Sequence, residues 1–275
     1  MQSVLMEKNE HLGIITLNRP KSLNAMNADL VEEFHRALDI FVEDEDIRVI
    51  ILTGAGRAFC AGGDLGYLES LNDDKKRKAF IERVGEMTLK LRNCAKPVIG
   101  MINGVTAGAG VNLMLACDIV CSSEDAKFIQ SFVNVGLVPD CGGMYLLKET
   151  VGLQKAKELM FTADVISAQE AEKLKMVMHV YTKEDLKIET EKIAQKIAQG
   201  APMAIMYMKK MLNKSYANLK DFLDEEALVQ TFCLGTEDCK EGILAFKQKR
   251  QPNFHDCRCQ ARHRLYGKGK CRHLR

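Results

Sequence analysis

Residues 96–110 read Lys96-Pro-Val-Ile-Gly-Met-Ile-Asn-Gly-Val-Thr-Ala-Gly-Ala-Gly110, an apolar run that passes into closely spaced glycines. The run 97–102 is short and rich in apolar residues, as expected for a buried strand. Glycine after a strand permits positive φ and lets a ligand approach the main chain closely. This segment therefore predicts a strand followed by a loop that presents backbone N–H groups.

Glycines gather in this part of the chain. Thirteen of the twenty lie between Gly54 and Gly143. They form four clusters at the ends of expected strands, at 53–57, 60–65, 103–110 and 135–143. A single cluster is as consistent with a tight turn as with a binding site. Four together favour a site built from backbone N–H groups.

The surrounding sequence predicts an α/β protein. Segments 12–18 and 48–53 are rich in β-branched residues and resemble buried strands. Between them, Asn27 can cap a helix, and a second amphipathic helix is expected around residues 80–91. From about residue 183, apolar residues recur at helical spacing without intervening strands. We therefore expect a mixed α/β body followed by a helical C-terminal part.

Composition excludes several classes of protein. With 275 residues, 47% of them hydrophobic and 28% charged, the chain can bury a substantial core. Ten cysteines without any CxxC pair suggest reduced thiols rather than a disulfide framework. The N-terminus lacks the order of a signal peptide, and no apolar window approaches eighteen residues. These features predict a cytoplasmic protein without a membrane-spanning segment.

The net charge of +2 is unevenly distributed. The last twenty residues contain seven basic residues and one acid, so they carry +6 and the preceding 255 residues carry −4. The tail also contains cysteines and histidines, namely Cys257, Cys259, His263, Cys271 and His273. Their spacing is not that of a standard zinc finger. Residues 255–275 are expected to be a disordered basic extension, with RNA binding or soft-metal binding as alternatives.

The glycine-rich region lacks the residues of several common sites. It has no phosphate loop, its Gly104, Gly108 and Gly110 lack dinucleotide-fingerprint spacing, and no histidine occurs between Gly54 and Gly152. No metal-ligand motif occurs in the body, so we expect no metal. The remaining groups are backbone amides and the carboxylates Asp64, Asp118 and Asp140. This set suits stabilising an oxyanion while one carboxylate moves a proton.

Six motifs along the chain can be compared with known families. They are Ala58-Phe-Cys-Ala-Gly-Gly-Asp-Leu65, the segment 96–110, Ala116-Cys-Asp118, Gly136-Leu-Val-Pro-Asp-Cys-Gly-Gly143, Asn18-Arg-Pro-Lys-Ser-Leu-Asn-Ala-Met-Asn27 and Phe246-Lys-Gln-Lys-Arg-Gln-Pro-Asn-Phe254. Together they resemble the crotonase family, which comprises enoyl-CoA hydratases and isomerases. The resemblance covers roughly residues 2–254, in order and at family spacing.

The resemblance implies a fold of ββα units arranged as a spiral, in a core domain over residues 1–200. A helical oligomerisation region would occupy residues 201–254 and build a homotrimer or a dimer of trimers. The implied substrate is an acyl-CoA thioester, so coenzyme A would be part of the substrate and no separate cofactor is expected. Because the body is acidic, the anionic CoA would have to be bound by local groups.

The resemblance also implies roles for individual residues. The backbone N–H groups of Gly63 and Ala109 would hold the thioester oxygen. The CoA and pantetheine path would be lined by Ala61, Gly62, Asp64 and Leu65. Phe246 and Lys249 match positions that contact the CoA nucleotide, commonly across a subunit boundary, although Lys249 equally suits a solvated surface. Asp118 is expected to have a structural role. Cys60 and Cys141 border the expected site and are expected to be spectators, without a nearby basic residue to lower their pKa.

Departures from the family pattern bear on the reaction. The positions of the two glutamates of family hydratases are occupied by Asn112 and Phe132, and neither side chain titrates. Asp140 stands where isomerases of the family place their working carboxylate. Its neighbours Leu137, Val138 and Pro139, with Phe132, would desolvate it and raise its pKa. Asn112 would either donate a hydrogen bond to substrate or pack in the interior.

We therefore expect a double-bond isomerase acting on an enoyl-CoA or a ring-type acyl-CoA, with Asp140 as the base. The sequence around Asp140 is also typical of a turn in which the aspartate accepts local N–H groups. Two alternatives to the isomerase stay open: an enoyl-CoA hydratase with an atypical site, and a non-catalytic binder of acyl-CoA or RNA.

Overall fold

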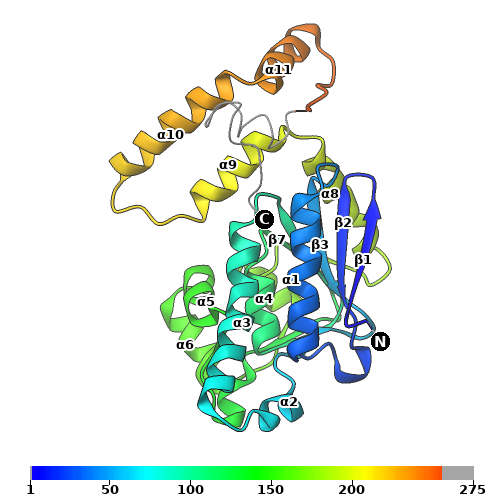
Figure 1. The fold of residues 1–275 in the computed structure, drawn as a ribbon, viewed down its shortest axis with the longest axis vertical. Helices are drawn as coiled ribbons and strands as arrows, with labels where there is room; N and C mark the ends of the chain where they lie inside the picture. Colours follow the sequence, from blue (N-terminus) through cyan, green and yellow to red (C-terminus); the bar gives the residue numbers. More distant parts are fainter. Residues whose placement is uncertain (1, 256–275) are drawn as a thin grey trace.

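Two β-sheets form the centre of the computed structural model, which describes residues 2–255 (Figure 1). The larger sheet has, in spatial order, β1 (Val4–Asn9), β2 (Leu12–Leu17), β3 (Val49–Gly54), β5 (Val98–Ile102), β7 (Ile119–Ser123) and β10 (His179–Tyr181). The smaller sheet has β4 (Ala58–Cys60), β6 (Val105–Ala107), β8 (Lys127–Ile129) and β9 (Ile166–Ser167). The three strands expected from their apolar runs correspond to β2, β3 and β5.

The chain alternates between the two sheets as it advances. β3, β5 and β7 belong to the larger sheet, and each is followed by a strand of the smaller sheet, β4, β6 and β8. In the larger sheet β3, β5 and β7 pair in parallel, and in the smaller sheet β4, β6 and β8 do the same. Among the described pairs, only β1 with β2 and β8 with β9 are antiparallel. This repeated ββ advance, followed by helices, confirms the predicted spiral of ββα units.

Helices surround the sheets and continue beyond them. The helices of the body are α1 (Ala28–Glu43), α2 (Leu65–Ser70), α3 (Asp74–Asn93), α4 (Ala109–Leu115), α5 (Gly143–Val151), α6 (Leu153–Thr162), α7 (Ala168–Lys173) and α8 (Leu186–Ala198). Two 3-10 turns are η1 (Pro20–Ser22) and η2 (Ser131–Val135). Asn27 caps α1 as expected, because its side chain accepts a hydrogen bond from the Leu30 N–H at 3.1 Å.

Strands β2, β3 and β5 of the larger sheet are buried on both faces, which explains why their sequences are nearly continuously apolar. In β3, Ile50 and Leu52 belong to the large core cluster that includes apolar residues of α1, α3 and α4. The alternate residues Val49 and Ile51 belong to a second cluster with residues of α8. This two-residue alternation places successive side chains of β3 on opposite faces of the sheet, so that each face packs against its own layer of helices.

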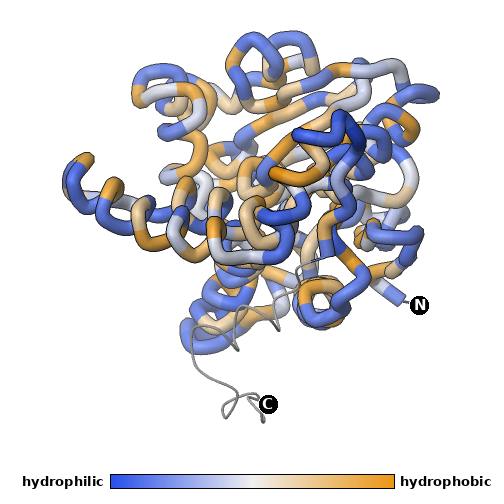
Figure 2. Tube along the Cα trace, turned by 90° about the horizontal axis from the view of Figure 1, so that it is seen from above, coloured by the Kyte–Doolittle hydropathy of each residue, from blue (hydrophilic) through white to orange (hydrophobic). Residues whose placement is uncertain are grey.

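The C-terminal helices extend away from the body (Figure 1). They are α9 (Pro202–Leu212), α10 (Leu219–Leu234) and α11 (Glu237–Gln248). No residue of α10 is buried, although Leu219, Leu223, Leu228 and Leu234 lie on it. Figure 2 shows hydrophobic residues interspersed with hydrophilic ones along the helices that project from the body. The expected boundary at residue 200 falls between α8 and α9.

Two findings concern the whole described chain. Within residues 2–255, no helix is both long enough and apolar enough to cross a membrane. The seven cysteines of this part are all free thiols. The tail cysteines and histidines discussed above, and the expected disorder of residues 255–275, concern a segment that lies outside the described residues except for His255.

Candidate active site

Two glycine-rich loops meet beside the smaller sheet. β4 and β6 pair in parallel, so the loops that follow them leave the same edge. Gly62 has a φ of +91°, and a Cβ placed on it would lie 3.0 Å from the Ala107 carbonyl oxygen and 3.3 Å from the Ala109 nitrogen. A side chain at position 62 would thus separate the loops. The absence of one brings the Gly63 and Ala109 segments together, as the sequence motifs suggested.

Two backbone N–H groups in these loops, those of Gly63 and Ala109, have no main-chain partner among residues 2–255. Ala109 is the first residue of α4, so its N–H has no acceptor inside the helix and lies at the positive end of the helix dipole. In the other loop, the N–H groups of Ala61 and Asp64 donate to the carbonyls of Leu23 and Met26. The Gly63 N–H between them donates to no other main-chain group within residues 2–255. Two such donors at neighbouring positions can stabilise an oxyanion.

Asp140 lies between η2 and α5, where its side chain is partly buried. Its Oδ1 atom is buried and has no hydrogen-bond partner within residues 2–255. Burial raises the pKa of Asp140 from 3.8 to about 6, opposed only by a hydrogen bond from its own backbone N–H. A carboxyl group with this pKa is largely ionised at neutral pH and can still hold a proton transiently, as a general base requires.

Asn112 and Phe132 lie beside the same loops. A Cβ on Gly108, directly before the Ala109 amide, would lie 3.6 Å from Cε2 of the Phe132 ring. Asn112 projects from α4, is fully buried, and donates from Nδ2 to the Asp140 backbone carbonyl at 2.9 Å. Its Oδ1 accepts a hydrogen bond from Gln130 Nε2 at 2.8 Å. The structure thus gives the Asn112 amide two protein partners, in keeping with the interior packing that the sequence left open beside a substrate contact.

Sequence reasoning missed Gln130 and Gly143. Gln130 precedes η2 and is only 3% exposed. A Cβ on Gly143 would lie 2.2 Å from Asn112 Nδ2, so this glycine leaves the space that the amide occupies. No local spacing in the sequence connects these positions. The one available signal is the glycine pair at 142–143, which belongs to the cluster 135–143 that favours a backbone N–H site and does not reveal the contact with Asn112.

The remaining predicted residues occupy different environments. Asp64 caps α2 by accepting from the Tyr67 N–H, and it pairs with Arg19 at 2.8 Å. Burial raises the pKa of Asp64, but the contacts with Arg19 and the Tyr67 N–H outweigh this effect. The pKa therefore lies below its usual value, and the carboxyl is ionised. Leu65 follows at the start of α2 and is 55% exposed. Asp64 thus stabilises the loop that carries Ala61, Gly62 and Gly63.

Phe246 and Lys249 are not brought to this site within one chain. Phe246 is on α11 and 86% exposed, and Lys249 is an exposed residue that ends this helix with a φ of +54°. Figure 1 shows α11 at the opposite end of the molecule from α2, which begins directly after the Gly63 loop. Any contact of α11 with a CoA at this site would therefore come from another subunit.

The two cysteines bordering the site have the environment expected of spectators. Cys60 is buried, its thiol donates to the Asn24 carbonyl, and burial raises its pKa to about 12. Cys141 is also buried, and burial raises the pKa of its thiol well above the usual range. Neither thiol is activated as a nucleophile, because the thiolate is the reactive form.

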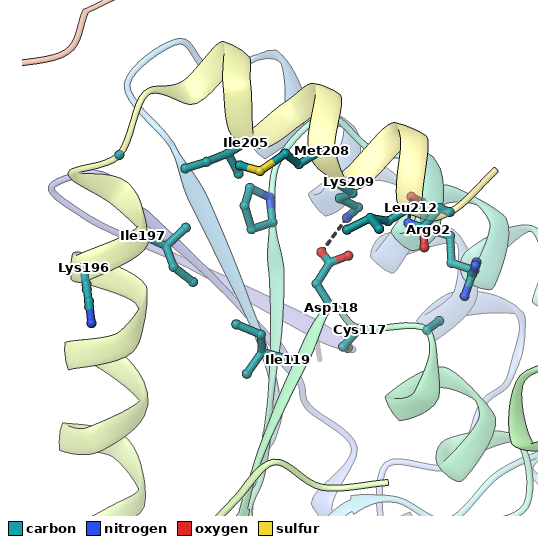
Figure 3. Close-up of a pocket in the computed structure, with 14 residues that line it drawn as sticks. Arg92, Cys117, Asp118, Ile119, Lys196, Ile197, Ile205, Met208, Lys209 and Leu212 are labelled. Atoms are coloured by element: carbon teal, nitrogen blue, oxygen red, sulfur yellow. Dashed lines mark hydrogen bonds and ion pairs between the residues drawn. The ribbon is translucent and has the colours of Figure 1, made fainter. Parts of the chain in front are cut away.

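Asp118 makes the structural contacts that its position predicts. Its Oδ2 accepts from the Val98 N–H and from Lys209 Nζ, each at 2.7 Å. Figure 3 shows this pair at the wall of a cavity of about 480 Å³ between α8, α9 and the starts of β5 and β7. Apolar side chains such as Ile197 and Ile205 form much of the wall. None of the predicted site residues lines this cavity, so it is separate from the glycine loops.

The sequence matches the model of the enoyl-CoA hydratase/isomerase family over residues 7–258. The chain belongs to this family. A relative in Dictyostelium discoideum, a probable mitochondrial enoyl-CoA hydratase, is 37% identical over 252 residues that cover 91% of this chain and 90% of the relative. The 1,2-epoxyphenylacetyl-CoA isomerase of Escherichia coli is 34% identical, with 92% and 98% covered.

Solved structures show the same fold. The crystal structure of an enoyl-CoA hydratase from Bacillus anthracis matches with a TM-score of 0.89 and 33% identity, covering 92% of this chain and 99% of that one. Family membership establishes an acyl-CoA enzyme of the hydratase/isomerase type. Because both hydratases and isomerases are among the relatives, the reaction has to be argued from the site of this chain.

Proposed function

We propose that this family member is a double-bond isomerase that converts a 3-enoyl-CoA, or a related ring-containing acyl-CoA, into the conjugated 2-enoyl isomer. The observation that carries the proposal is the buried carboxyl of Asp140, which has a pKa of about 6. Asn112 and Phe132 offer no second titratable group beside it. A single carboxylate is sufficient for a proton shift, whereas hydration also requires a group to hold and activate water.

In the proposed reaction, the thioester oxygen is held by the N–H groups of Gly63 and Ala109. The Asp140 carboxylate removes a proton from C2, and the electron pair of that C–H bond moves into a dienolate whose oxygen faces the two amides. Protonated Asp140 then returns the proton to C4, which leaves the double bond between C2 and C3. No atom is gained or lost. Each preorganised donor contributes about 3–4 kcal/mol of barrier lowering.

The deciding experiment compares two substrates on one preparation. A 3-enoyl-CoA should gain the absorbance of a conjugated thioester, while crotonyl-CoA should lose that absorbance only if the enzyme hydrates it. We expect fast isomerisation and little or no hydration. Faster hydration than isomerisation would favour an atypical hydratase. Tight acyl-CoA binding without turnover of either substrate would favour a non-catalytic binder.

The pH dependence of isomerisation should report Asp140. Since only the carboxylate can accept the C2 proton, kcat/KM should be low in acid and rise to a plateau with a midpoint near pH 6. The rise should follow one ionisation, because no second carboxylate is expected to act. The measurement is a profile of initial rates from pH 4.5 to 8.5 at constant ionic strength. A midpoint near 4 would mean that the base is a solvated carboxylate.

The arm formed by α9, α10 and α11 supports assembly into a homotrimer or a dimer of trimers. Leucines along α10 are exposed in the single chain, with Leu228 73% exposed. Fully burying a leucine contributes about 1.5–3 kcal/mol, so several such residues favour a subunit interface. Assembly would also explain how Phe246 and Lys249 could reach a CoA bound to a neighbouring subunit.

Leu228→Glu is expected to weaken this assembly at least tenfold, because it would place a charge in the interface. Gln230→Glu adds the same charge to α10 at a position two residues away and is the matched control. Light scattering after size-exclusion chromatography measures the mass of each species across a dilution series. An unchanged mass for Leu228→Glu at every concentration would show that α10 is not part of the interface.

The proposed location is the cytoplasm. Seven free thiols in residues 2–255, several of them buried in the body, support a reducing compartment.

A further inference from the structure

We propose that Asn112 and Gln130 are positioning residues that orient Asp140 through its backbone carbonyl. The inference rests on the proposed role of Asp140 as the base, and it concerns how the protein holds that base in place. Asn112, at a position that is glutamate in family hydratases, and Gln130 would then serve the reaction without touching substrate.

The contacts form a directed chain. The Asp140 carbonyl can only accept hydrogen bonds, so the Asn112 amide must present Nδ2 to it, at 2.9 Å. Asn112 Oδ1 then faces Gln130, whose Nε2 donates to it at 2.8 Å. Each amide orientation is fixed by the preceding one. Gln130 thereby prevents the Asn112 amide from turning its oxygen toward the Asp140 carbonyl.

The loop of Asp140 is held at several further points. The Asp140 carbonyl also accepts from the Gly143 N–H at 2.8 Å, and the Thr88 hydroxyl of α3 donates to the Cys141 carbonyl at 2.9 Å. Cys141 has a φ of +49°, a backbone conformation that residues other than glycine rarely adopt. Packing of Asn112 against Gly143 fills the space where a Cβ would lie. The backbone of residues 140–143 is thus fixed by α3 and α4 together.

The hydrogen bonds from Gln130 to Asn112 and from Asn112 to the Asp140 carbonyl do not involve the Asp140 carboxyl group. Burial raises the pKa of Asp140, and the only opposing contact is its own N–H. An amide donating to the carboxylate would stabilise the charge and weaken the base. By taking the backbone carbonyl instead, Asn112 fixes the position of Asp140 without lowering its basicity. Gln130 supports this arrangement although its Oε1 is buried without a partner in the described chain, a costly state for an amide.

A double-mutant cycle tests the inference. Asn112→Leu removes the donor to Asp140, and Gln130→Met removes the group that orients Asn112. Each single variant should lower kcat by about 10–100-fold with KM changed less than twofold, since a misplaced base affects the chemical step. If Gln130 acts only through Asn112, the double variant should be no slower than Asn112→Leu alone. If the reductions of kcat in the two single variants multiply in the double variant, Gln130 does not act through Asn112 and the inference is wrong.

Hydrogen exchange provides a readout that does not depend on turnover. In both single variants, amides of the segment 140–143 should exchange at least tenfold faster than in the wild type. Asn112→Leu removes the side-chain donor to the Asp140 carbonyl, and Gln130→Met leaves that donor free to turn away from it. Ser122→Ala is the control, since Ser122 makes a buried hydrogen bond of its own to the Ser123 carbonyl on β7. It should leave this segment unchanged. Gln130→Met keeps the test available should Asn112→Leu fail to fold.

The two proposals fail in different ways. Unchanged exchange in both variants that fold would overturn the positioning role, whatever the reaction is. Faster exchange together with no isomerisation by the wild type would overturn the proposed reaction and leave the positioning of Asp140 intact.

Discussion

Asp140→Asn is expected to lower kcat for isomerisation of a 3-enoyl-CoA by about 10²–10⁴-fold, the usual effect of losing a general base. The amide keeps the size of the carboxyl group but cannot accept the C2 proton. KM should change little, because the Gly63 and Ala109 N–H groups that hold the thioester remain. Initial rates from the conjugated-thioester absorbance measure the loss. Equal turnover by the variant and the wild type would exclude Asp140 from the mechanism.

The same variant should be more stable than the wild type at neutral pH. Burial raises the pKa of Asp140 from 3.8 to about 6, so protonation of this group favours the folded state. That contribution is complete below about pH 3.8 and is lost as the pH rises through 6. The amide cannot ionise, so at pH 7.5 the variant should gain up to about 3 kcal/mol in unfolding free energy.

Urea unfolding at pH 7.5 and at pH 4.5 checks this expectation. The advantage of Asp140→Asn should be largest at pH 7.5 and should shrink at pH 4.5, where the wild-type carboxyl is mostly protonated in the folded protein. A variant less stable than the wild type at pH 7.5 would show that the ionised carboxyl has favourable contacts in solution.

Gly110→Ala is expected to lower kcat/KM by at least 10²-fold. A Cβ at this position would lie 2.2 Å from the Cys60 carbonyl oxygen, a backbone atom that cannot move alone. Because Cys60 leads into the Gly63 loop and Gly110 follows Ala109, relief of this clash would separate the two N–H groups. Loss of one oxyanion donor typically costs 10²–10³-fold.

Gly85→Ala is the matched control for this substitution. Gly85 lies within α3, and a Cβ on it would meet nothing within 4 Å. Alanine should therefore leave turnover unchanged and stabilise the helix by up to about 1 kcal/mol. Parallel measurement of kcat/KM and of the unfolding temperature separates the two variants. Wild-type kcat/KM in folded Gly110→Ala would show that the two loops do not form one oxyanion site.

Strands β2, β3 and β5 could be predicted from the sequence because both of their faces are buried. Continuous apolar runs such as 48–53 follow directly from that burial. By contrast, β9 and β10 have only two and three residues and lie between helices. Their strand conformation depends on partners far away in the chain, β8 and β7, which no local pattern reveals.

The candidate site was partly predictable for a similar reason. Gly63, Ala109 and Asp140 stand in contiguous motifs, so a local sequence match located them. Gln130 and Asn112 are eighteen residues apart and meet only because η2 and α4 lie together in the fold. The sequence left Asn112 either in contact with substrate or packed in the interior, because the residue type alone does not show which acceptor an amide faces.

The two N–H groups proposed to hold the thioester, those of Gly63 and Ala109, belong to the main chain. Mutation can weaken them only by changing the shape of the loops, whereas the groups that would move protons are single side chains at positions such as 112, 132 and 140. In the proposed site, thioester activation and proton transfer therefore depend on different parts of the chain. Substitutions at the side-chain positions can change the proton transfer while the two main-chain N–H groups remain.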